Sequence, residues 1–249
     1  MVNSAIYLGG FVGVLLSGGF VYWEIGKFAA PQVPRSLFDE RKEMIAYTAG
    51  LFVGVPLALV FLLFLTSMTA GFVLDGAVES LVLVAGGELA QWMLVRSVYF
   101  GSTEASPFYA LGFRAGVGGI LILATVAGYF GAGLLTPIGV GLVLVQSVAL
   151  LQIEIAGSLL SLRATRESHR VGGGPLSGAL VSVIAFYFLG LGAFLGAVEG
   201  LVAAAIVAAG MGWVFVRLRG PILSRVRAPS AVSDEDAKPS EPSFGRIDR

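Results

Sequence analysis

The chain has 249 residues, of which 56% are hydrophobic and only 13% are charged, and its net charge is zero. Soluble globular proteins carry about 25% charged residues, so most of the surface of this protein cannot face water. The chain has no cysteine, which excludes disulfides, thiolate metal sites and cysteine nucleophiles. The balanced charge points to no particular partner, and we expect none among nucleic acids.

Apolar runs long enough to cross a bilayer follow one another along most of the chain. A membrane-spanning helix needs about 20 residues. These runs lack the alternation of barrel strands, so they can span a membrane only as helices. We therefore predict an all-α, polytopic transmembrane helical bundle of seven spans over residues 1–227, surrounded by the lipid bilayer. The predicted spans cover residues 5–23, 44–66, 70–95, 109–131, 137–160, 175–197 and 201–217.

The two ends of the chain lie outside the regular pattern of spans. No basic segment precedes the first apolar run and no small-residue cleavage site follows it, so we predict a retained span rather than a signal peptide. In residues 228–249 the apolar runs end, and proline mixes with serine and acidic residues. This composition indicates a disordered cytoplasmic tail.

Basic residues fall in alternate connections between the predicted spans. No lysine or arginine occurs in the connections at residues 67–69, 132–136 and 198–200, whereas each of the other connections and the C-terminal flank contains arginine. Positively charged loops remain on the cytoplasmic side of a membrane, so we predict the N-terminus outside and the C-terminus inside. The expected location is a prokaryotic cell membrane.

Two parts of this prediction are unusual. The predicted span 70–95 contains the three acidic residues Asp75, Glu79 and Glu88. Only residues 198–200 separate the last two predicted spans, so we expect a tight helical hairpin there. Omitting any one span would destroy the regular alternation of basic connections, which favours the count of seven.

Glycine accounts for 35 residues, many of them spaced four apart within predicted spans. Small residues on one helix face let helix backbones approach closely in a bilayer. We interpret these glycines as packing contacts within the bundle. The alternative is a contact with a second copy of the chain, or with another membrane protein, through the last series. The sets are Gly9 with Gly13, Gly50 with Gly54, Gly112 with Gly116, and Gly192 with Gly196 and Gly200.

Three ionisable residues fall at one predicted depth on consecutive spans. Glu88, Arg114 and Glu154 lie roughly 7–9 Å to the cytoplasmic side of the middle of their spans, at about 1.5 Å per residue. One arginine can hydrogen-bond two carboxylates, so we predict a buried network of the three, with Gln91 and Gln152 beside it. We interpret the network either as a clamp that fixes helix packing or as a proton- or substrate-coupling site.

Asp75, Glu79 and Glu199 form a predicted acidic cluster near the outer surface. The connections on that side contain no basic residue that could neutralise them. Their side chains either extend to the outer interface or line an acidic vestibule that attracts cations. Glu88 falls near the helix face opposite Glu79, so the cluster and the network are not expected to form one relay.

No residue pattern typical of catalysis occurs in the predicted spans. The single histidine, His169, falls in a predicted basic loop, and no HExxH zinc motif is present. We therefore assign no catalytic, cofactor-binding or metal-ligating residue. We expect a non-enzymatic membrane component or accessory subunit. The alternative is a small carrier or channel for a proton, cation or small solute that uses the intramembrane carboxylates.

Overall fold

The structure is a computed structural model that describes residues 2–24, 38–100, 105–131, 136–167 and 174–223. These residues form seven α-helices and contain no strand, which confirms the all-helical prediction for this part of the chain. The predicted tail, residues 228–249, lies outside the described residues. The helices are α1 (Val2–Glu24), α3 (Glu40–Thr69), α4 (Val73–Arg96), α5 (Ser106–Gly131), α6 (Pro137–Glu167), α7 (Gly174–Leu195) and α8 (Ala197–Leu223).

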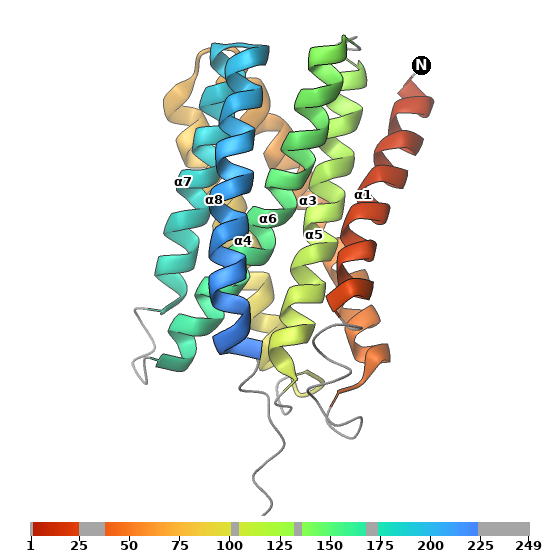
Figure 1. Ribbon diagram of the computed structural model, residues 1–249, viewed down its shortest axis with the longest axis vertical. Helices are drawn as coiled ribbons and strands as arrows, with labels where there is room; N and C mark the ends of the chain where they lie inside the picture. The colour runs from red at the N-terminus through yellow and green to blue at the C-terminus, as the bar shows by residue number, and fades with distance from the viewer. Residues whose placement is uncertain (1, 25–37, 101–104, 132–135, 168–173, 224–249) are drawn as a thin grey trace, which may run out of the picture.

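The helices stand side by side in one bundle and run up and down in turn (Figure 1). The N-terminus of α1 and the C-terminal end of α8 therefore lie at opposite ends of the bundle (Figure 1). Six of the helices are long and apolar enough to cross a membrane, as an integral membrane protein requires. The exception among the described helices is α4, which contains four charged residues, Asp75, Glu79, Glu88 and Arg96.

The two ends of the bundle differ in charge. The basic end is where α1, α4, α6 and α8 finish, and the acidic end is where they begin. Arg96 and Arg217 lie toward the basic end, and their guanidinium groups lie 4.4 Å and 5.4 Å from the ring centroids of Trp92 and Trp213. Tryptophan gathers at membrane–water interfaces, so these pairs are typical of an interfacial level.

Helix α5 is the central helix of the bundle. Of the residues in its apolar segment, 83% are buried, compared with 22% in α1 and 33% in each of α3, α7 and α8. Helices α1 and α3 both pack against α5, and α6 packs against it as well. Side chains on different faces of α5 therefore point into different helix interfaces.

Glycines allow α1 and α3 to lie directly on α5. A Cβ atom added to Gly50 of α3 would overlap the carbonyl oxygen of Phe113, and one added to Gly13 of α1 would overlap that of Gly119. Backbone therefore touches backbone at both interfaces, as expected for glycine-mediated packing in a membrane. These contacts lie within the chain.

The hairpin between α7 and α8 is tighter than predicted, and its position corrects the sequence-based boundaries. Only Gly196 separates the two helices, with a φ of +143° that L-amino acids rarely adopt. Residues 198–200, which we predicted to be the connection, belong to the first turn of α8. Gly192 of α7 and Gly200 of α8 face each other across the hairpin, so the predicted glycine series does not lie on a single helix.

Candidate functional site

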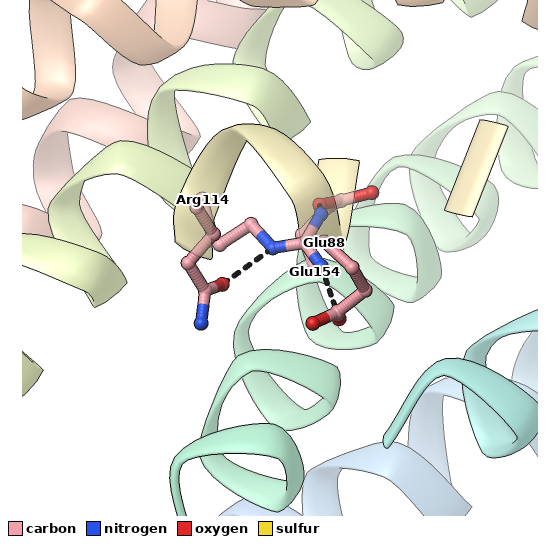
Figure 2. Close-up of polar contacts among 4 residues, drawn as sticks. Glu88, Arg114 and Glu154 are labelled. Atoms are coloured by element: carbon pink, nitrogen blue, oxygen red, sulfur yellow. Dashed lines mark hydrogen bonds and ion pairs between the residues drawn. The ribbon is translucent and has the colours of Figure 1, made fainter. Parts of the chain in front are cut away.

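Arg114 is the centre of a buried polar network that joins three helices. The side chain is 3% exposed, and it extends from α5 toward Glu88 and Glu154 (Figure 2). Its Nε donates to Oε1 of Gln91 at 2.8 Å, and its Nη1 donates to Oε2 of Glu154 at 2.9 Å. Its Nη2 donates to Oε1 of Glu88. We call these four residues the Arg114 network.

The Arg114 network connects α4 and α6, two helices that have little direct contact with each other. Helix α4 packs mainly on α3 and α7, whereas α6 packs mainly on α7, α8 and α5. The long arginine side chain reaches from α5 to a carboxylate on each of α4 and α6. Gly87 of α4 provides the space, because a Cβ atom at this position would overlap Nη1 of Arg114.

The Arg114 network carries more negative than positive charge. Two carboxylates share one guanidinium, and Glu88 is the more exposed of them, at 13% compared with 5% for Glu154. A cavity of about 90 Å³ adjoins Glu88 and Gln91, and the exposed Arg96 lines it as well. A water molecule needs roughly 10–15 Å³ of such volume, so the cavity can hold several waters beside Glu88.

Gln152 does not belong to the network that we predicted around it. Its Oε1 atom is buried and has no hydrogen-bond partner, and its side chain lies near Gly212 of α8. Residues two apart in a helix differ by about 200° in direction. Because Glu154 points toward α5, Gln152 points toward α8 instead.

The predicted outer acids lie near the acidic end, but no hydrogen bond or ion pair links them in the part of the chain that the structure describes. Glu79 accepts a hydrogen bond from the Ser67 hydroxyl at 3.0 Å, and its other carboxyl oxygen is buried without a partner. Asp75 and Glu199 are exposed. Within the described residues these three acids are not arranged to hold a metal ion together.

A cavity of about 440 Å³ opens at the acidic end between α3, α5, α6 and the α7–α8 hairpin. We call it the outer cavity. Threonine, glycine and leucine side chains dominate its lining, and Tyr129 adds a phenol. Asp75, Glu79 and Glu199 do not line it, so the outer cavity is not the acidic vestibule considered from the sequence.

Two further buried acids were not anticipated from the sequence. Glu24, the last residue of α1, is 2% exposed, and Glu43, in the first turn of α3, is 1% exposed. None of their four carboxyl oxygens has a hydrogen-bond partner. We call them the inner acid pair. The helical register could have indicated their burial, because Glu24 lies on the same helix face as Ser17 and Glu43 on the same face as Tyr47.

The inner acid pair lies where α1 and α3 meet over α5, a closed interface that we call the groove. The hydroxyl groups of Ser17 and Tyr47 are hydrogen-bonded across this groove at 2.9 Å. The carboxyl group of Glu43 rests on Gly112 of α5, where a Cβ atom would overlap Oε1. Gly112 and Arg114 are two residues apart, so the groove and the Arg114 network occupy opposite faces of α5.

Comparison with known proteins adds no assignment for these sites. No family model, curated protein or solved structure matches the chain. Within the described residues, no group of three or more His, Asp or Glu side chains is arranged to hold a metal ion. The chemistry of the sites is therefore argued from their geometry alone.

Proposed function

We propose that the chain is a seven-span integral protein of a prokaryotic cell membrane that acts as a non-enzymatic component, packing against another membrane protein as an accessory subunit. Helix α4 counts as the seventh span because it packs on α3, α5 and α7, with Glu88 paired to Arg114 and an exposed apolar outer face. The basic end carries Arg96, Arg163 and Arg217, which supports a cytoplasmic C-terminus and an external N-terminus.

The observation that carries this proposal is the closed state of the Arg114 network. Arg114, Gln91 and Glu154 are each at most 5% exposed, and every nitrogen of the guanidinium donates a hydrogen bond within the chain. Leu121 of α5 and Leu150 of α6, both fully buried, lie between the network and the outer cavity. Such an arrangement favours a clamp that fixes helix packing over a pathway.

The test combines purification with reconstitution. The tagged chain is cross-linked in its native membrane, extracted in mild detergent and analysed by mass spectrometry, and the purified chain is placed in liposomes for proton and sodium flux assays. We expect a near-stoichiometric membrane partner and no flux above that of empty liposomes. Recovery of this chain alone, together with flux that Glu88→Gln abolishes, would contradict the proposal.

The second candidate is a carrier for a proton or cation, and two observations favour it. Glu88 borders the cavity of about 90 Å³ near the basic end, so one carboxylate of the network is within reach of the basic end of the bundle. Gln146, which is 2% exposed with an unpartnered carbonyl oxygen, lies on α6 between Glu154 and the outer cavity. Flux that is lost in Glu88→Gln and kept in Asp75→Asn, an exposed acid on the same helix, would favour this candidate.

A further inference from the structure

We propose that the inner acid pair, Glu24 and Glu43, is a proton-binding site that holds at least one proton at neutral pH. The site lies at the basic end of the bundle, on the face of α5 opposite the Arg114 network. It goes beyond the function proposed above and does not depend on whether the chain is a subunit or a carrier.

The helical register brings the two acids together. Glu24 lies seven residues after Ser17 on α1, and Glu43 lies four residues before Tyr47 on α3. Because the two helices run in opposite directions and Ser17 is hydrogen-bonded to Tyr47, both acids lie on the same side of that bond. At about 1.5 Å per residue their levels differ by only about 5 Å. The register therefore places the two carboxyl groups in the same part of the interface between α1 and α3.

Burial without partners makes a doubly charged pair unfavourable. An ionised carboxylate that loses its water needs a cation or hydrogen-bond donors, and otherwise it takes up a proton. Glu24 and Glu43 are at most 2% exposed, and no side chain in the described part of the chain donates a hydrogen bond to their carboxyl oxygens. Two facing carboxylates also repel each other, and binding one proton removes that repulsion.

Three basic side chains on the surrounding helices contact other groups. Lys42, next to Glu43 on α3, donates to the carbonyl oxygen of Tyr99 at 2.9 Å. Arg114 of α5 donates to the Arg114 network on the other face. Arg219 of α8 lies 5.7 Å from the ring centroid of Phe215. Within the described residues, the other titratable groups near the basic end of α1, α3, α5 and α8 are Tyr22, Asp39, Glu40, Arg41, Tyr47, Tyr109 and Arg217.

The proton stabilises the attachment of α1. Helix α1 packs almost entirely on α5 through glycine contacts, and the Ser17–Tyr47 hydrogen bond is its polar link to α3. With two protons bound the pair carries no net charge, and with one proton it carries a single negative charge. When it loses its last proton at high pH, two negative charges face each other in an apolar groove and push α1 away from α3.

The test uses dicyclohexylcarbodiimide, an apolar reagent that modifies protonated carboxyl groups outside water. The full-length protein in detergent is treated at about pH 7, where an ordinary glutamate with a pKa of about 4.3 is ionised, and the adducts are mapped by mass spectrometry. We expect an adduct on Glu24 or Glu43 whose yield falls as the pH rises. Glu40, one turn before Glu43 and exposed, is the matched control and should remain unmodified.

Variants locate the proton, although the decisive comparison needs only the wild-type protein. In Glu43→Gln the remaining modification should lie on Glu24, and in Glu24→Gln it should lie on Glu43. The absence of an adduct on both residues in folded wild-type protein at about pH 7 would overturn the proposal. Equal modification of Glu40 and the inner acid pair would overturn it as well, because the reagent would then not be reporting burial.

Discussion

On one face of α5, two buried carboxylates share the guanidinium of Arg114, whereas on the opposite face Glu24 and Glu43 are buried and form no ion pair or hydrogen bond with the residues that the structure describes. The same helix separates the two regions, since Gly112 contacts Glu43 and Arg114 points the other way. The two faces show two ways to bury acids in a membrane bundle. One supplies a fixed positive charge, and the other leaves neutralisation to a proton.

Glycines have different roles in the packing of the two regions. The guanidinium of Arg114 needs space on α4, and Gly87 provides it. The inner acid pair needs no such space for a partner, and glycines there bring the α1 and α3 backbones close to α5 instead. We infer that neutralising a side chain should lower the stability of the Arg114 network and leave that of the inner acid pair almost unchanged.

The largest expected effect comes from Arg114→Leu. This change leaves Glu88 and Glu154 buried without their cation, and removing one partner of a buried ion pair costs about 3–5 kcal/mol of unfolding free energy. Denaturation in detergent measures the loss. Arg217→Leu, on an exposed position of α8, is the control and should change stability little. If both variants were equally stable, the Arg114 network would not hold the bundle together.

The next largest effect separates the glycines on the two faces. In Gly87→Ala the new methyl group meets a guanidinium held by three hydrogen bonds, so we expect a loss of about 1–3 kcal/mol. In Gly112→Ala it meets the unbonded carboxyl group of Glu43, which can shift, so the loss should be smaller. Thermal unfolding of both proteins, with Gly210→Ala as a control in open space, gives the order. A greater loss in Gly112→Ala would reverse the comparison.

Neutralising a single acid should lower the unfolding free energy by a larger amount in the Arg114 network than in the inner acid pair. Glu154→Gln weakens a charge-assisted hydrogen bond to Arg114 and should cost about 1–3 kcal/mol. Glu43→Gln replaces a protonated, unpartnered carboxyl group by an amide of similar shape, so the cost should stay below about 1 kcal/mol. Unfolding measured at neutral pH compares them directly, and a larger loss in Glu43→Gln would indicate a charged Glu43.

A small effect is also expected for the hydrogen bond between α1 and α3. Ser17→Ala removes the hydrogen bond to Tyr47 and should cost about 1 kcal/mol. A double-mutant cycle with Tyr47→Phe isolates this interaction from the other contacts of the two side chains. A coupling energy of zero would show that Ser17 and Tyr47 do not fix the register of α1 against α3.

Much of the fold follows from the sequence because long apolar runs permit only helices in a membrane. The position of the α7–α8 turn does not, since charge placed Glu199 in the connection, whereas an acid is also favourable in the first turn of a helix. The chain instead turns at Gly196, where only glycine readily adopts the required φ.

The sites were predictable to the extent that depth determines them. Glu88, Arg114 and Glu154 meet because they lie at one level, but Gln152 lies at that level and points to another helix. The inner acid pair could not be found from depth, because charges at the ends of apolar runs ordinarily reach water. Their burial arises from the packing of α1 and α3 on α5. The helical register of each acid gives its helix face, but it does not tell which helices pack on that face.

The most direct test of the difference between the two faces is infrared spectroscopy of the carbonyl stretch of protonated carboxyl groups in the purified protein at neutral pH. We expect a band that decreases in Glu24→Gln or Glu43→Gln and is unchanged in Glu154→Gln. The absence of the band in the wild-type protein, or its loss in Glu154→Gln alone, would contradict a proton shared by the inner acid pair.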